Sequence, residues 1–290
     1  MKTPYYLIDK SRLQANMEKI AWLREASGAK SLLALKCFAT WSVFDFMAQY
    51  MDGSTSSSLY EVKLGYEKFG GETHAYSVAY DDDEIAEVTR VVADQTGKRG
   101  VTVAADGGWW TGKTVEFARY CREVGADVLM VKPPIWGGSV TVDTLVAHYK
   151  EVAAEIPVML VTNIWAANPA QGLRTIEVLL DKVVGIVAIK DDILGQFVRQ
   201  MTAMVSDEWA VFAGGQKQNH LDIVHYGAVG YMSTFVTFHS PVTHQYWDAV
   251  ERGDWTAAAK VIAEHDRPLF EYIGGLQGGF DAGMHGLLEL

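Results

Sequence analysis

Two lysines in this chain stand where a side-chain amine could react with a carbonyl group. Lys36 follows the apolar run at residues 32–35, and Lys190 follows the apolar run at residues 183–189. Burial disfavours a charged ammonium, so a lysine that enters an apolar pocket loses its proton more easily. The neutral amine can then condense with an aldehyde or ketone. Lys36 and Lys190 are therefore candidate Schiff-base residues.

Each lysine also has a purely structural interpretation. The stem of Lys36 can pack at a strand end while its ammonium stays in water. Lys190 is followed directly by Asp191 and Asp192, so it can form an ion pair or cap a loop instead of reacting. Position alone leaves both interpretations open.

Residues 107–114 have the spacing of a phosphate-binding loop, Gly-x-x-x-x-Gly-Lys-Thr. Such a loop turns consecutive backbone N–H groups inward around phosphate, and the adjacent Trp109 and Trp110 would crowd that arrangement. We expect an ordinary loop between a strand and a helix, with Thr111 or Thr114 capping the helix.

The eight histidines and two cysteines do not form a metal-binding pattern. His220 and His225 share one predicted helix, but they lack the i, i+4 spacing of a paired metal motif. Cys37 and Cys121 lie far apart in the chain, which favours buried free thiols over a disulfide or a zinc site. We predict no metal site.

The charge and hydropathy of the chain exclude several classes of partner. Its 25 Lys and Arg residues against 36 Asp and Glu residues give a net charge of -11, which argues against nucleic-acid binding. No apolar stretch approaches the roughly 18 residues of a membrane span. The N-terminus lacks the apolar region of a secretory signal. We expect a soluble, cytoplasmic protein with neither nucleic acid nor membrane as partner, and the oligomeric state stays open.

The elements that must position these residues follow a repeating order. From residue 31 onward, a short apolar run, a turn and an amphipathic stretch alternate, which is typical of parallel strands with crossover helices. The nine predicted strands are residues 31–36, 53–57, 73–80, 101–106, 127–132, 157–163, 185–191, 210–215 and 229–234. Runs that are apolar at every position indicate strands covered on both faces. We predict an α/β fold, a (β/α) TIM-type barrel forming one domain, with further helices from about residue 241.

Residues 1 to about 80 resemble carboxynorspermidine decarboxylase. The segments that carry the resemblance are residues 3–9, 34–44, 56–62 and 74–80. That family belongs to the fold-type III pyridoxal-phosphate barrels, so the resemblance implies a cofactor lysine at Lys36. It also implies that Ser57, Ser58, Glu61 and His74 line the cofactor pocket. The resemblance stops before the late barrel loops that hold the cofactor phosphate in the family, so these five residues are vestigial candidates.

Residues from about 83 to 290 resemble a second group, the dihydrodipicolinate synthase and N-acetylneuraminate lyase superfamily. The segments that carry this resemblance are residues 125–134, 156–160, 185–192 and 213–216. The resemblance implies that Lys190 forms a Schiff base with pyruvate or another small 2-oxo acid. Two departures argue against full activity: residues 77–83 replace the family's loop for the substrate carboxylate, and Thr162 stands where the family has a proton-relay tyrosine. Thr162 is retained as a candidate catalytic residue.

The two resemblances meet abruptly near residue 80 and account for the strand count. The first piece, residues 1–80, contributes three strands, and the second, residues 83–290, contributes six, which gives nine in a single barrel. The leading hypothesis is an engineered chimera with no secure native activity. The alternatives are a class I aldolase-like lyase acting through Lys190 and pyridoxal-phosphate binding or decarboxylation at Lys36.

Overall fold

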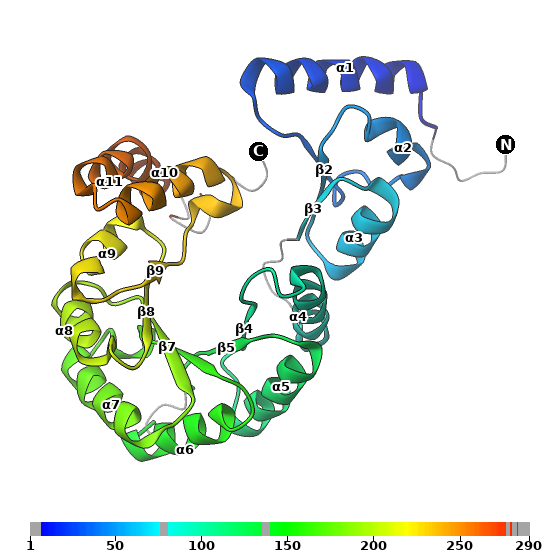
Figure 1. Ribbon diagram of the computed structural model, residues 1–290. Helices are drawn as coiled ribbons and strands as arrows, with labels where there is room; N and C mark the ends of the chain where they lie inside the picture. The colour runs from blue at the N-terminus through cyan, green and yellow to red at the C-terminus, as the bar shows by residue number, and fades with distance from the viewer. Residues whose placement is uncertain (1–6, 76–80, 135–139, 277–278, 280–282, 284–290) are drawn as a thin grey trace. The chain divides into compact units, whose positions relative to one another are not determined.

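The structure is a computed structural model that describes residues 7–75, 81–134, 140–276, 279 and 283 (Figure 1). The fold is α/β, and all of its strand pairs are parallel. The chain divides into two compact units, and the division falls between Ile85 and Ala86. Across the described ranges, none of the helices is long and apolar enough to cross a membrane.

The first unit holds a three-stranded sheet in the order β1-β2-β3. Its elements are α1 (Lys10–Ser27), β1 (Leu32–Ala34), η1 (Trp41–Val43), α2 (Phe44–Met47), β2 (Gly53–Ser56), α3 (Leu59–Leu64), η2 (Gly65–Phe69) and β3 (Glu72–Ala75). Its core is formed by Leu33 and Leu35 with Phe44, Met47 and Phe69. The sheet therefore buries its apolar side chains within its own unit.

Strand β2 owes its place to a glycine at its first position. A Cβ atom on Gly53 would lie 1.9 Å from the carbonyl oxygen of Glu72, so only glycine permits this approach of β2 to β3. Ser54 and Ser56 are buried at 0% and 1% exposure. A polar strand thus occupies an interior position, because backbone pairing with both neighbours holds it there.

The second unit holds six parallel strands in sequential order, β4-β5-β6-β7-β8-β9. The strands are β4 (Val103–Ala105), β5 (Val128–Val131), β6 (Val158–Val161), β7 (Ile186–Asp191), β8 (Ala210–Ala213) and β9 (Gly230–Tyr231). Helix α4 (Asp82–Thr96) precedes β4 and starts within the first unit. The helices between the six strands are α5 (Thr111–Val124), α6 (Val142–Ala153), η4 (Asn163–Trp165), α7 (Pro169–Lys182), α8 (Gly195–Val205), α9 (Lys217–Leu221) and η5 (Val224–Tyr226). The sheet curves into a half-barrel with helices α5 to α8 along its outer face (Figure 1).

Strand β6 is apolar and covered on both faces. All four of its residues are buried, and Val158 and Leu160 are 0% exposed. This confirms for β6 the prediction that a continuous apolar run forms a strand buried on both faces. In β7 the prediction was wrong at one position, because Val187 is 39% exposed.

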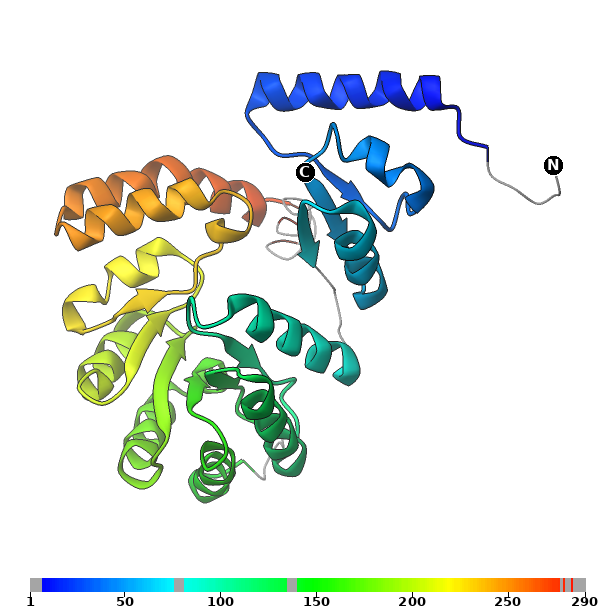
Figure 2. The same ribbon diagram turned by 45° about the vertical axis from the view of Figure 1, so that its right-hand side comes forward.

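Helices follow the last strand, as predicted. They are η6 (Phe235–Thr237), α10 (Ser240–Glu251), α11 (Trp255–Val261), η7 (Ile262–Asp266) and α12 (Arg267–Gly274). Helices α10 and α11 lie side by side (Figure 2), and their Tyr246, Ala249 and Ala258 form a buried cluster with Ile262 of η7.

The predicted count of three plus six strands is confirmed in the described part of the chain. Residues 76–80 of the third predicted strand lie outside the described residues. A single closed barrel, and the predicted division into pieces 1–80 and 83–290, stay predictions.

Candidate functional site

The carboxyl ends of β6, β7 and β8 bring the second unit's candidate residues to one rim. Val161 on β6 pairs with Lys190 on β7, and Asp191 on β7 pairs with Ala213 on β8. Thr162 follows β6 directly. In a barrel, side chains at this end of the strands are the ones available for chemistry. The fold therefore places Lys190 and Thr162 at neighbouring strand ends.

Lys190 is held in an ion pair with Asp192. Its Nζ atom lies 2.7 Å from each carboxylate oxygen of Asp192. The side chains are 19% and 32% exposed, so the pair is partly shielded from water. The structure thus realises the ion pair foreseen for this lysine, with Asp192 as its partner.

Asp191 turns inward and organises the loop that follows β7. It is fully buried and accepts hydrogen bonds from the backbone N–H groups of Ile193 at 3.2 Å and Leu194 at 2.8 Å. The Thr162 hydroxyl donates a third hydrogen bond at 2.9 Å. Burial raises the pKa of the Asp191 carboxyl, and these hydrogen bonds oppose that rise.

Thr162 uses both functions of its hydroxyl in this arrangement. Its Oγ1 donates to Asp191 and accepts the backbone N–H of Asp192 at 2.9 Å. Thr162 is also fully buried. This geometry ties the end of β6 to the loop after β7 and leaves the hydroxyl no free proton to relay.

The loop after β7 contains one residue with a strained backbone. Leu194 has φ +71° and ψ -172°, a combination that costs a non-glycine residue about 1–3 kcal/mol. On β8's side, a Cβ atom on Gly214 would lie 2.2 Å from Oδ1 of Asp192 and 2.7 Å from the carbonyl oxygen of Asp191. Only glycine at position 214 leaves room for the Asp192 carboxylate in its observed place.

The segment that matches a phosphate-binding loop is filled by protein groups. Asp106 is 4% exposed and accepts hydrogen bonds from the backbone N–H groups of Lys132, at 3.0 Å, and Gly108. Thr114 donates a hydrogen bond to the same carboxylate at 3.3 Å. Burial raises the pKa of Asp106. A carboxylate thus takes the N–H group that would otherwise face a phosphate.

Neither threonine of this segment caps helix α5, so that expectation was wrong. Trp110 is the N-cap residue and makes no side-chain capping bond. Thr111 is instead hydrogen-bonded to Nδ1 of His148 at 2.9 Å. Thr114 donates its hydroxyl proton to Asp106 instead, because a buried carboxylate that lacks hydrogen-bond donors carries a large free-energy cost.

The candidates from the first unit contribute to local structure. Ser58 caps α3 by accepting the backbone N–H of Glu61 at 3.3 Å, and Glu61 in turn accepts the N–H of Ser57 at 2.7 Å. Nε2 of His74 lies 3.3 Å from Oε2 of Glu72. Lys36 is exposed. Ser57, Ser58 and Glu61 meet at one helix start.

The two cysteines differ in environment. Cys121 is buried, as predicted, and burial raises the pKa of its thiol to about 12. Cys37 is exposed, so the prediction of a buried thiol was wrong there. Its segment follows β1 as a turn, and a turn at a strand end stays at the surface.

A third lysine, which sequence reasoning missed, is the most deeply buried. Lys217 is 1% exposed, and its Nζ lies 2.6 Å from Oδ1 of Asp266 and 3.8 Å from the centre of the Phe235 ring. Burial lowers the pKa of Lys217, while the ion pair with Asp266 opposes that change. The two partners are 49 residues apart, so no local spacing signals the pair.

Six parallel strands in sequential order, alternating with helices, define the second unit as a (β/α) half-barrel of the TIM type. Comparison with known proteins identifies the family of this unit. Residues 69–274 match the dihydrodipicolinate synthetase family, and the chain belongs to that family.

A synthase and a decarboxylase match different parts of the chain. 4-Hydroxy-tetrahydrodipicolinate synthase 1 of Streptomyces coelicolor is 33% identical over 211 residues, covering 68% of this chain and 64% of the relative. The carboxynorspermidine/carboxyspermidine decarboxylase of Herminiimonas arsenicoxydans is 75% identical over 88 residues, 30% of this chain and 24% of the relative. The chain thus spans under two thirds of each. Both predicted resemblances are confirmed.

Solved structures support the fold. YagE, a prophage protein of the dihydrodipicolinic acid synthase family from E. coli K12 in complex with pyruvate, aligns with a TM-score of 0.61 at 20% identity. The alignment covers 87% of this chain and 80% of YagE. N-Acetylneuraminate lyase from Mycoplasma synoviae aligns with a TM-score of 0.58.

Proposed function

We propose that the chain is an engineered chimera whose remaining chemistry is Schiff-base formation between Lys190 and a small 2-oxo acid. The change in similarity along the chain supports the chimera. An N-terminal segment of 88 residues is 75% identical to a decarboxylase, whereas a stretch of 211 residues is only 33% identical to a synthase of another family. One natural lineage would be expected to keep a single family throughout.

The position of Lys190 carries the proposed chemistry. An amine at this strand end can attack the C2 carbonyl of a 2-oxo acid, and loss of water then gives a protonated imine that draws electrons from the adjacent carbon. YagE was solved with pyruvate, which supports a ligand of this class here. The ion pair with Asp192 must open before the amine can react.

Two features argue against efficient turnover. Asp192 places a negative charge beside the amine, which opposes the approach of a 2-oxo acid anion. Thr162, the residue in the tyrosine position, is committed to Asp191 and Asp192. A lyase needs a group that moves a proton, and this hydroxyl is not available for it. We therefore propose imine formation without a secure native activity, and lyase turnover is the alternative.

Trapping the imine tests the proposal. Borohydride reduction in the presence of pyruvate should add one reduced pyruvyl group, detected by intact mass and located at Lys190 by peptide mapping. Lys190→Met should abolish the adduct. Lys132→Met, which removes a lysine after β5, is the matched control and should retain it. No adduct at saturating pyruvate, or an adduct that survives in Lys190→Met, would contradict the proposal.

Pyridoxal phosphate at Lys36 is the second candidate, favoured by the 75% match of the N-terminal segment. The described residues do not fit such a site. Ser57, Ser58 and Glu61 are engaged at the start of α3, and Lys36 is exposed instead of lying in a pocket. We therefore propose no reaction step through this cofactor. A cytoplasmic location stays a prediction.

A further inference from the structure

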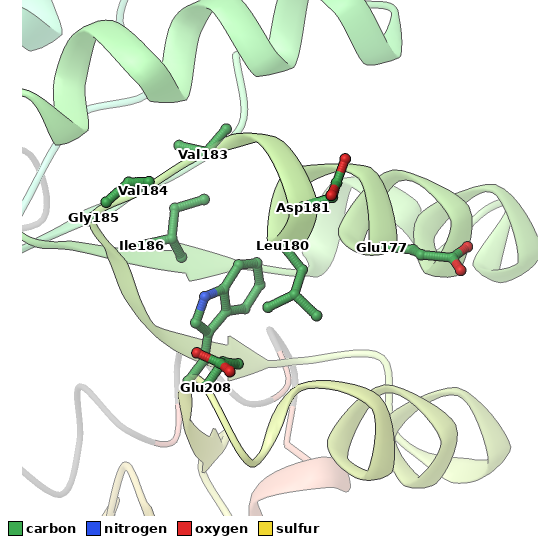
Figure 3. Close-up of a pocket in the computed structure, with 9 residues that line it drawn as sticks. Glu177, Leu180, Asp181, Val183, Val184, Gly185, Ile186 and Glu208 are labelled. Carbon is green, nitrogen blue, oxygen red and sulfur yellow. The ribbon is translucent and has the colours of Figure 1, made fainter.

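Two features of the second unit lie outside the candidate site. One is a pocket of about 660 Å³ at the amino ends of β7 and β8 (Figure 3). Its acidic residues Glu177, Asp181 and Glu208 are all exposed, and exposed carboxylates alone do not define a ligand. The other feature is His220 on α9, whose side chain is 0% exposed. A fully buried histidine has the more definite chemistry, because a proton can change its charge in the interior.

His220 has a hydrogen-bond partner for only one of its two ring nitrogens. Nδ1 lies 2.9 Å from the hydroxyl oxygen of Tyr246 on α10. Tyr246 donates its single proton to the carbonyl oxygen of Lys217 at 3.1 Å, so Nδ1 of His220 carries the proton of the neutral ring and donates it to Tyr246. Nε2 is buried and has no hydrogen-bond partner among the described residues. The neutral ring therefore leaves no donor without an acceptor.

Aromatic rings from two elements surround His220. The ring centres of Tyr231 on β9 and of Tyr246 and Trp247 on α10 lie 5.7, 5.9 and 5.6 Å from its own. Such rings attract a cation, but less strongly than the water that burial removes. A second proton would add a positive charge and an N–H group at Nε2, where no acceptor lies. Burial accordingly lowers the pKa of His220 from 6.5 to about 4.

The charged groups buried beside α9 already have partners. Lys217 on α9 is bound by Asp266 of η7. On the next element, the ammonium of Lys260 on α11 lies 3.7 Å from a carboxylate oxygen of Glu264 on η7. Strand β8 consists of alanine, valine and phenylalanine, so it brings no titratable side chain to this junction.

The other titratable side chains on the elements around His220 are Tyr231, Tyr246, Asp222, His225, His244, Asp248, Glu251 and His265. Both tyrosines stay neutral, because burial raises the pKa of each. His265 is half-buried, and the remaining side chains are exposed. His225 also packs against Trp255 of α11, with ring centres 4.5 Å apart. His220 is thus the fully buried histidine of this junction.

His220 joins α9 to a cluster that the last helices form. The cluster contains Tyr246 and Ala249 of α10, Ala258 of α11 and Ile262 of η7. Leu221 of α9 and Tyr231 of β9 pack against it. Because the hydrogen bond from His220 reaches Tyr246 in this cluster, a change at the histidine acts directly on the attachment of α10 and α11.

We propose that His220 is an acid-sensitive switch that controls the docking of α10 and α11 on α9 and β9. Uptake of one proton at Nε2 favours an open state, in which the two helices have moved away and water reaches the ring. Opening exposes the apolar cluster around Tyr246, while the strands of the half-barrel stay paired. Loss of the proton restores the closed state.

Amide hydrogen exchange in residues 240–261 measures the opening. After correction for the intrinsic exchange rate, the opening constant should rise roughly 25-fold from pH 7.5 to pH 5, because the pKa of His220 is about 4 when closed and 6.5 when exposed. Measurements stop at pH 5, where carboxylates with ordinary pKa values near 4 are still largely ionised. A constant that does not change with pH would overturn the proposal.

Exchange in β6 tests the extent of the opening. At pH 5 the amides of residues 158–161 should exchange more slowly than those of residues 240–261, because the strands stay paired in the open state. Equal opening constants in the two segments would mean that the whole unit opens, which contradicts a switch confined to the helices.

Neutral replacements assign the proton to His220. His220→Gln and His220→Phe cannot take up a proton, so the opening constant of residues 240–261 should no longer change between pH 7.5 and pH 5. His225→Gln combined with His265→Gln is the matched control and should retain the rise. A rise that persists in the His220 variants, or that disappears in the control, would refute the switch. If both His220 variants are already open at pH 7.5, the wild-type protein and the control decide.

Discussion

Lys190 combines a reactive position with a restrained amine. Its Nζ contacts both oxygens of Asp192, so the nitrogen is engaged in an ion pair and this pair must open before the nitrogen can attack a carbonyl group. The Asp192 N–H is bonded to Thr162 Oγ1, the absence of a side chain at Gly214 leaves room for the carboxylate, and Leu194 in the same loop has a strained backbone. Backbone strain of this kind persists only where surrounding contacts impose it. Asp192 is therefore the residue that most directly limits the reactivity of Lys190.

Replacing Asp192 tests this restraint. Asp192→Asn should increase the rate of borohydride trapping with pyruvate, by up to about tenfold, because the pair is partly exposed and its energy is modest. The gain has two causes: the amine is released, and one negative charge that opposes the 2-oxo acid is removed. Trapping rates measured by intact mass against time give the result. An unchanged rate would show that Asp192 does not restrain the amine, and a slower rate would show that Asp192 assists it.

At the scale of elements, one hydroxyl joins β6 to the loop after β7. Thr162 Oγ1 bridges the Asp191 carboxylate and the Asp192 N–H. Burial raises the pKa of Asp191 above its ordinary value of about 3.9. The native state therefore holds this proton more tightly than the unfolded state does. The resulting stability is full below pH about 3.9 and falls as the pH rises through the native pKa.

Thr162→Val should make this pH dependence steeper. Without its donor the ionised carboxylate is less stable, so the pKa of Asp191 rises further. The variant should lose about 1.5–3 kcal/mol of unfolding free energy at neutral pH and less below pH about 4. Urea unfolding across that range measures the difference.

Thr175→Val is the matched control for this prediction. It removes a buried hydroxyl that donates to the carbonyl of Gln171 at 2.9 Å, where no carboxylate is involved. The unfolding free energy that Thr175→Val loses should be the same at every pH in this range. If the loss in Thr162→Val is equally independent of pH, Asp191 does not depend on this hydrogen bond.

Strand order and the place of Lys190 could be predicted because they follow from runs of adjacent residues. The partner of Lys190 could also have been predicted more narrowly: in a strand, positions i and i+2 face the same side, which selects Asp192 over Asp191. The Lys217–Asp266 ion pair could not be predicted from the sequence, because only tertiary packing joins residues that lie so far apart in the chain. The steric need for glycine at position 214 likewise depends on a neighbouring strand.

At the scale of the whole molecule, each unit has its own sheet and its own buried side chains. Phe44 is fully buried in the first unit's core, and Leu160 is fully buried on β6 in the second. Because each unit buries apolar side chains of its own, two cooperative units are expected to unfold separately.

Calorimetry of the full chain should accordingly show two transitions. Phe44→Ala leaves a cavity in the first core, worth about 3–5 kcal/mol, and should lower only one transition. Leu160→Ala, at about 2–5 kcal/mol, should lower only the other. Because each variant serves as the control for the other, no truncated protein is needed. A single transition that both variants lower would contradict this prediction, because it would mean that the pieces before and after residue 80 unfold as one cooperative unit.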